Sequence, residues 1–169
     1  IDGGNIVKSR TKVIMTSRIV YKNRKRYRKE QLIEKLKKLL DVKQVIIIPQ
    51  CPRDKFGHAD GMVRFYDGVK DEMTAFASDY CRDLSFKKKF YKALKGQGVW
   101  PSFIPYNPYN NKGYLDATGV YINYLQIGKL VIYPIYGLKE DDLAEKWFTS
   151  FFGSNAMPIK ANAIAREGG

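Results

Sequence analysis

The stretch KEQLIEKLKKLLDVKQVIIIP, residues 29–49, predicts a helix followed directly by a buried strand. Its first part places leucine and isoleucine at helical spacing with lysines on the opposite face, as in an amphipathic helix. Residues 45–49 are a short β-branched run that ends at proline, which is typical of a strand. Because the helix has one apolar face that a sheet must cover, the stretch favours an α/β fold.

This order recurs twice, at intervals of roughly 55 residues, which is typical of a repeated architecture. Helices are predicted at 85–98 and 140–153, and the strands that follow them at 102–105 and 157–160. Two strand-like segments precede each of the three helices: 5–9 and 12–20, 62–68 and 72–78, and 120–127 and 129–136. Such strand-strand-helix-strand units cannot bury their apolar faces alone, so they stack or close into a ring. We place the three units at residues 1–57, 58–117 and 118–169.

The segments that link one unit to the next are the predicted location of a functional site, because equivalent links gather at one place in a ring. The first link holds His58, the only histidine of the chain, and Asp60 two residues later. In an extended chain these two side chains point to one face. Asp116 in the second link either lines the same cavity or is simply a turn residue.

The chain is strongly basic, with a net charge of +13, and its densest basic run covers residues 21–29. This run is either a solvated loop before a helix or, together with the twelve tyrosines, a surface for single-stranded nucleic acid. The two cysteines, Cys51 and Cys81, are too few for a disulfide framework, which indicates reduced thiols and a cytoplasmic protein. We expect no membrane segment and no secretory leader, because the apolar runs are short.

Four motifs resemble, in order, those of agmatine deiminases and bacterial peptidylarginine-deiminase-like proteins of the pentein superfamily. They are DGGN at 2–5, GHADGMVRF at 57–65, INYLQIGKLVIYPIYG at 122–137 and the terminal EGG at 167–169. The resemblance covers essentially the whole chain. It implies an α/β propeller of five strand-strand-helix-strand modules, of which about three are present. The chain would then be a fragment of a partial deiminase domain, in keeping with its first residue, which is not methionine.

The resemblance also implies site roles. His58 takes the general acid and base role, and Asp60 binds the guanidinium group. Asp2 orients the histidine or pairs with the substrate, although family members usually have glutamate at this position. The nucleophilic cysteine would follow Gly169, so the fragment itself should be inactive, and Cys51 and Cys81 are interpreted as structural thiols.

The predicted activity is C–N hydrolysis of a guanidine compound, with agmatine converted to N-carbamoylputrescine as the first choice, a step of putrescine biosynthesis. Free arginine or peptidyl-arginine is the next choice. No metal or organic cofactor is expected; a mixed metal site in the first link matches no familiar ligand spacing. Three modules leave bare apolar faces, which predicts a homo-oligomer or association with the missing modules. The alternatives are a nucleic-acid-binding module, which we consider unlikely, or a non-catalytic relative.

Overall fold

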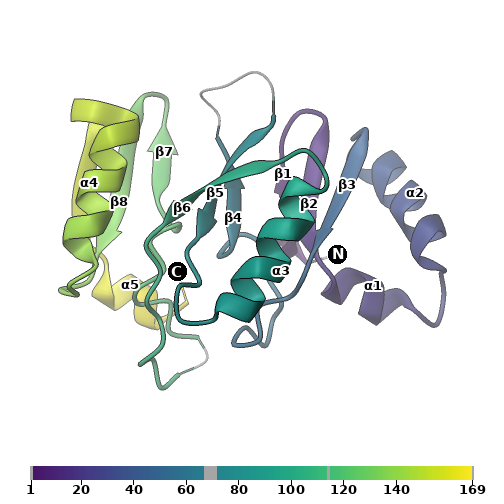
Figure 1. Ribbon diagram of the computed structural model, residues 1–169, viewed down its shortest axis with the longest axis horizontal. Coiled ribbons are helices and arrows are strands. Elements are labelled where there is room, and N and C mark those ends of the chain that lie inside the picture. Colours follow the sequence, from purple (N-terminus) through teal and green to yellow (C-terminus); the bar gives the residue numbers. More distant parts are fainter. Residues whose placement is uncertain (1, 67–71, 114, 169) are drawn as a thin grey trace. The chain divides into compact units, whose positions relative to one another are not determined.

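The computed structural model describes residues 2–66, 72–113 and 115–168, which form a mixed α/β fold with three small sheets (Figure 1). Each sheet has three strands in chain order, β1-β2-β3, β4-β5-β6 and β7-β8-β9. The strands are β1 (Val7–Lys8), β2 (Lys12–Thr16), β3 (Gln44–Ile48), β4 (Val63–Phe65), β5 (Thr74–Ser78), β6 (Trp100–Ile104), β7 (Leu125–Ile127), β8 (Leu130–Ile135) and β9 (Ala156–Lys160). The helices are η1 (Gly3–Asn5), α1 (Arg18–Asn23), α2 (Lys29–Leu40), α3 (Leu84–Lys95), α4 (Asp141–Phe152), η2 (Gly153–Asn155) and α5 (Asn162–Arg166).

The three sheets repeat one plan. In each, the first two strands are antiparallel, and a long helix (α2, α3 or α4) lies in sequence between the second and third strands. The second and third strands are parallel in the first and last sheets. The three predicted long helices and the strands that follow them are therefore confirmed, with small differences at their ends.

One predicted strand is too long. Residues 17–20 were expected to extend the strand at 12–20, but β2 ends at Thr16 and α1 begins at Arg18. The Ser17 amide donates to the carbonyl of Ile48, at the end of β3, and the Ser17 carbonyl accepts from the Tyr21 amide. The chain therefore leaves the sheet at Ser17 and turns into a helix, despite the β-branched residues that follow.

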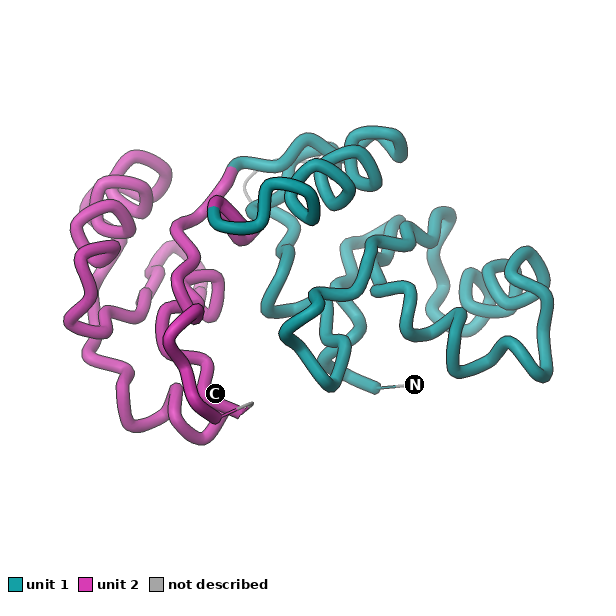
Figure 2. The backbone as a smooth tube through the Cα atoms, turned by 60° about the horizontal axis from the view of Figure 1, so that its bottom comes forward, with its two compact units in different colours: residues 1–77, 82–102 teal, residues 78–81, 103–169 magenta. Residues whose placement is uncertain are grey.

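The chain divides into two compact units, which Figure 2 distinguishes by colour. The first unit contains residues 1–77 and 82–102, and the second contains residues 78–81 and 103–169. The first unit therefore holds the whole of the β1-β2-β3 sheet, and the second the whole of the β7-β8-β9 sheet. Within the described part of the chain, no helix is long and apolar enough to cross a membrane.

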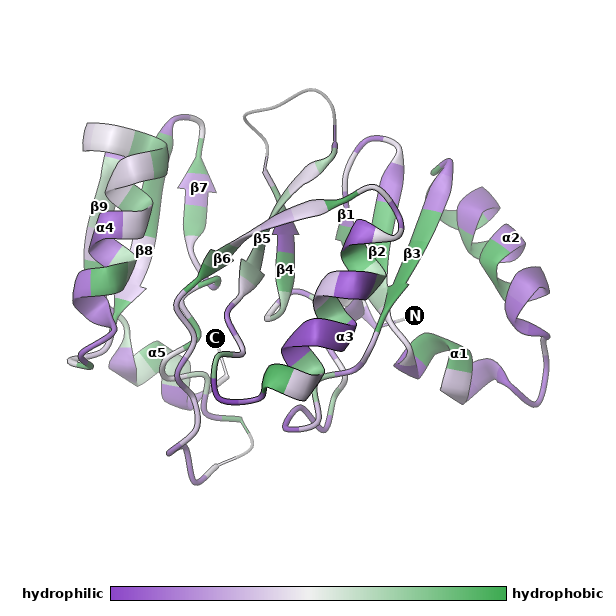
Figure 3. Ribbon diagram, viewed as in Figure 1, coloured by the Kyte–Doolittle hydropathy of each residue, from purple (hydrophilic) through white to green (hydrophobic). Residues whose placement is uncertain are grey.

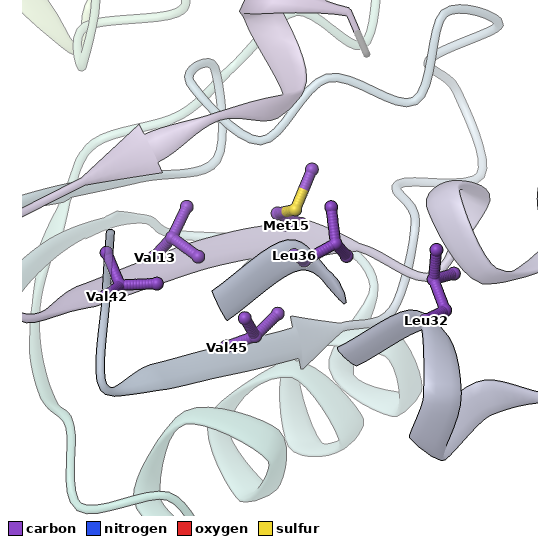
Figure 4. Packing of buried hydrophobic residues seen from close by; sticks show 6 residues of the cluster. All are labelled: Val13, Met15, Leu32, Leu36, Val42 and Val45. Atoms are coloured by element: carbon purple, nitrogen blue, oxygen red, sulfur yellow. The ribbon is translucent and has the colours of Figure 1, made fainter. Parts of the chain in front are cut away.

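In the first unit, α2 covers the sheet with its apolar face. Leu32 and Leu36 of α2 pack with side chains of β2 and β3, as Figure 4 shows. The six buried residues of this cluster are Val13, Met15, Leu32, Leu36, Val42 and Val45. Figure 3 shows the matching distribution of hydropathy, with β2 and β3 mostly hydrophobic and α2 carrying both kinds of residue. The apolar residues at helical spacing in residues 29–40 thus form the contact between helix and sheet. This contact holds the ends of β2 and β3 in place.

In the second unit, one carboxylate fixes the start of α4. Asp141 accepts the Tyr121 hydroxyl hydrogen bond at 2.6 Å. Burial, and then the Asp141 carboxylate, raise the pKa of Tyr121, so the phenol stays protonated and remains a donor. Three backbone amides also donate to Asp141: Tyr136, Gly137 and Leu138. Asp141 thus joins the loop after β8 and the side chain of Tyr121 to the helix.

Replacing this carboxylate should destabilise the protein. In Asp141→Ala the Tyr121 hydroxyl, on a fully buried residue, loses its acceptor. We expect the free energy of unfolding to fall by about 2–3 kcal/mol in urea denaturation. The matched control is Asp142→Ala, one residue along the same helix and exposed, which should change it by less than about 0.5 kcal/mol. Equal effects of the two substitutions would contradict this account of Asp141.

Candidate active site

The loop between β3 and β4 is ordered by Asp54. Its two carboxylate oxygens accept the backbone amides of Phe56 at 2.7 Å and His58 at 2.6 Å. The Gln50 side chain donates to the Asp54 carbonyl at 2.8 Å. Asp54 therefore fixes the backbone conformation next to His58, the only histidine of the chain.

The Asp2–Asn5 segment binds this loop from the other side. The Gly4 carbonyl accepts both the Ala59 amide, at 2.8 Å, and the Asp60 amide, at 3.1 Å. The Cα of Gly4 lies against the imidazole, since a Cβ added at Gly4 would be only 2.6 Å from Nδ1 of His58. Real Cβ atoms essentially never approach so closely, so the contact requires glycine at this position.

Two buried polar side chains join both segments to the sheet. The Asn5 side-chain oxygen accepts the amide of Thr16, the last residue of β2, at 2.7 Å. The Thr16 hydroxyl donates to the Gly57 carbonyl at 2.6 Å. Gly57 has a φ of +70°, a conformation that favours glycine. The end of β2 thus fixes the η1 segment and the histidine loop relative to each other.

These contacts bring His58 and Asp2 together. The Nε2 atom of His58 lies 3.1 Å from Oδ2 of Asp2, and the other Asp2 oxygen accepts the Gly4 amide at 3.3 Å. The hydrogen bond with His58 is the main cause that lowers the pKa of Asp2, so this carboxyl is ionised at neutral pH. Because an ionised carboxylate only accepts, Nε2 carries the proton in this pair. The side chains remain 33% and 54% exposed, respectively, so a ligand can reach them.

Phe56 contributes an apolar surface to the pair. Its ring is stacked on the imidazole, with centroids 5.4 Å apart and an angle of 28° between the ring planes. Asp2 and Phe56 thus limit the orientations that the His58 ring can adopt, one through a hydrogen bond and the other through stacking.

Asp60 is close to His58, but not in the way the sequence predicted. Residues 58–60 were expected to be extended, whereas the amides of Met62 and Val63 both donate to the Ala59 carbonyl, which makes a turn. The turn arises because the Ala59 and Asp60 amides are already bound to Gly4 and cannot join a strand. Desolvation raises the pKa of Asp60 and the charge of His58 opposes that rise, so the two groups are near enough to interact.

The remaining predicted site residues have different outcomes. Asp116 belongs to the second unit, where it accepts the Thr118 amide at 2.9 Å in a local turn, so its place beside His58 stays a prediction. Cys51 is buried and Cys81 exposed, and neither forms a disulfide. Among the described residues, no three histidine, cysteine, aspartate or glutamate side chains converge where they could hold a metal ion.

A cavity of about 450 Å³ lies elsewhere in the first unit, between α2, β3 and α3. Its walls include Lys29, Lys89 and Lys92, and it shares no lining residue with the site around His58.

The fold is one found in solved structures of deiminases. A family model described as Porphyromonas-type peptidyl-arginine deiminase matches residues 1–169, so the chain belongs to this family. No curated protein matched the chain in a sequence comparison.

Solved structures of agmatine deiminases share the fold. The enzyme of C. jejuni superposes with a TM-score of 0.74 and 24% identity, over 100% of this chain and 52% of that one. The agmatine deiminase of Enterococcus faecalis gives a TM-score of 0.73 and 20% identity, over 99% of this chain and 54% of that one. The chain therefore spans about half the length of these proteins.

The contact between Gly4 and the imidazole can be tested with neighbouring glycines. In Gly4→Ala the new methyl group would displace the His58 ring from Asp2, and we expect a loss of about 1–3 kcal/mol in unfolding free energy. A Cβ at Gly3 would meet open space, so Gly3→Ala should change neither the unfolding free energy nor the position of the His58 ring. NMR of the single imidazole, combined with urea unfolding, measures both effects. An unchanged imidazole signal in Gly4→Ala would contradict the contact.

The hydrogen bond itself predicts a titration change. In His58→Ala the pKa of Asp2 should rise toward its ordinary value of 3.8, because the main cause that lowers it is gone. The lowered pKa stabilises the fold above pH 3.8, and this contribution is lost as the pH falls through the folded value. The carboxyl ¹³C signal of Asp2 reports the pKa directly. The control is Phe56→Leu, which removes the stacking on the imidazole but keeps the hydrogen bond, so the pKa of Asp2 should stay lowered. An ordinary pKa of Asp2 in the wild-type protein would contradict its pairing with His58.

Proposed function

We propose that the whole protein containing this chain is a deiminase that hydrolyses a C–N bond of a guanidine compound and releases ammonia. The pair formed by His58 and Asp2 on the Gly4 backbone is the observation that carries this proposal. We further propose that the three sheets are three of the five modules of a pentein-type α/β propeller, with module boundaries near residues 57 and 117. The two thiols without disulfides are consistent with a cytoplasmic location.

The nucleophile in this proposal is a cysteine thiolate outside residues 1–169. It attacks the guanidinium carbon and forms a covalent tetrahedral adduct. Collapse of the adduct breaks one C–N bond and releases ammonia, which leaves an S-alkyl thiouronium. Water then adds to the same carbon, and the C–S bond breaks to give the ureido product and regenerate the thiolate.

His58 moves the protons in both halves of this reaction. Because Nε2 is held by Asp2, Nδ1 is the nitrogen left to give a proton to the departing amine and to take one from the incoming water. The ionised Asp2 stabilises the imidazolium that exists before the first transfer and again after the second. The interaction between Asp2 and His58 thus both orients the ring and supports its charged form.

Asp60 binds the guanidinium group in this proposal, and Asp116 is a further candidate for contact with the substrate. A carboxylate can accept two parallel N–H hydrogen bonds from a guanidinium, which fixes the plane of the cation. The chemistry uses only side chains and water, so it requires no metal or organic cofactor. Agmatine is the substrate in the names of two structural relatives, and peptidyl-arginine is the one in the family description.

The assay is release of ammonia and of a ureido product from guanidine compounds by the whole protein. His58→Ala and Asp60→Ala should each lower kcat/KM by at least about 100-fold, since each removes a group that acts on the reacting atoms. Asp142→Asn, an exposed substitution on α4, is the matched control and should retain the wild-type rate. Normal turnover by both site variants would reject the assigned roles, and no turnover of any guanidine compound by the wild-type protein would reject the deiminase proposal.

A further inference from the structure

The cavity between α2 and α3 in the first unit is a groove with an aliphatic lining. Both helices pack against β3, the edge strand of its sheet, which lies between them in Figure 1. Val45 and Ile47 of β3 are two residues apart, so their side chains point to the same side of the strand. Ile33 of α2 and Ala93 of α3 complete the aliphatic lining. The volume of about 450 Å³ is typical of sites for small molecules.

Three lysines stand around this lining. Lys29 is the first residue of α2, and Lys89 and Lys92 are three residues apart on α3, so these two share a face of that helix. All three are exposed, and within the described part of the chain none of them forms an ion pair or a hydrogen bond. The lining includes no acidic residue, and α3 contains five lysines and no carboxylate. An anion in the groove would therefore meet positive charge on both walls.

A hydrogen bond closes one end of the groove. Gln44, the first residue of β3, donates its side-chain amide to the carbonyl and the side-chain oxygen of Gln97, both at 3.2 Å. Gln97 lines the groove just after the end of α3, whereas Lys89 lies near the middle of that helix. Because α2 ends at Leu40, shortly before β3 begins, Lys29 at its other end lies toward the far end of β3. The groove thus runs from a cationic entrance past the aliphatic lining to the bond between the two glutamines.

These features fit an organic anion with one aliphatic chain. A carboxylate or phosphate head can form charge-assisted hydrogen bonds with the lysines, and the chain can displace water from the aliphatic lining. A helix is about 10 Å across, so a third helix has no room over a strand that both walls already contact, which argues against an amphipathic peptide. Among the described residues, the lining holds no aromatic ring on which a base could stack, which argues against nucleic acid.

We propose that the groove between α2 and α3 binds an aliphatic carboxylate or phosphate with a single chain, its head at the three lysines and its chain against the aliphatic lining. The groove shares no residue with the pair formed by His58 and Asp2, so this inference does not depend on the deiminase function. The same chemistry is found in a free fatty anion and in a membrane lipid. The closed end favours the free molecule, because a chain held in a bilayer would have to leave it to enter the groove.

The test is calorimetric titration of the whole protein with dodecanoate and with dodecyl phosphate, each below its critical micelle concentration. We expect one ligand to bind per chain and to raise the urea midpoint of unfolding. The double substitution Lys89→Gln and Lys92→Gln should weaken binding by about 10- to 100-fold, because it removes two charge-assisted hydrogen bonds. Ala93→Phe should abolish binding by filling the groove. The matched control is Lys88→Gln, an exposed lysine of α3 that does not line the groove, and it should bind as the wild type does.

Further ligands show which part of the molecule is bound. Acetate and inorganic phosphate offer the head without the chain, and dodecanol offers the chain without the charge; each should bind at least about 10-fold more weakly than dodecanoate. The NMR amide signals of Val45 and Ile47 should shift on binding, while the imidazole signal of His58 should not.

Urea unfolding without ligand shows whether each variant is folded, and the two lysine substitutions lie at exposed positions, so they decide the matter even if Ala93→Phe does not fold. Equal binding of acetate and dodecanoate, or unchanged binding in the double lysine variant, would overturn the inference. Binding only to vesicles of phosphatidylglycerol, or only to an acidic amphipathic peptide, would overturn it as well. None of these measurements involves guanidine turnover, so failure here leaves the deiminase proposal standing.

Discussion

The site depends on the close contact between the backbone of Gly4 and the loop of His58. One carbonyl accepts two consecutive amides, and the bare Cα beneath the imidazole leaves room for the ring. Any side chain at this position would push the ring away from Asp2. The backbone of Gly4 therefore fixes where the ring can lie, and Asp2 and Phe56 limit its orientation.

The repeated sheet plan explains why these segments meet. The chain enters β1 directly after Asp2–Asn5, and α2 then returns it to β3, parallel to β2. The histidine loop follows β3, so its start lies beside the end of β2, where Thr16 contacts both Asn5 and Gly57. Burial of the apolar face of α2 stabilises this arrangement. The two hydrogen bonds of Thr16, to Asn5 and to Gly57, then connect the first sheet to the site.

Much of the fold was predictable, because the spacing of apolar residues shows which face of an amphipathic helix is buried. Residues 29–40, 85–98 and 140–153 all have apolar residues at helical spacing. The β-branched residues after Ser17 suggested that the strand continues, but β2 ends at Thr16. The hydrogen bond from the Ser17 amide to the Ile48 carbonyl marks this end, and it joins positions far apart in the sequence. His58 and Asp60 were predicted as site residues from their motif. Gly4, Thr16 and Asp54 could not be given their roles, since each acts through a partner that no local pattern specifies.

The tautomer of the only imidazole is the most direct test of this account. In the neutral form at high pH, ¹⁵N NMR of the labelled whole protein should show Nε2 protonated and Nδ1 unprotonated, because the Asp2 carboxylate holds the proton on Nε2. Substitution Asp2→Asn should return the ring toward a mixture of tautomers. A wild-type ring protonated mainly on Nδ1, or one that does not respond to Asp2→Asn, would contradict the claim that Gly4 and Asp2 together fix this histidine.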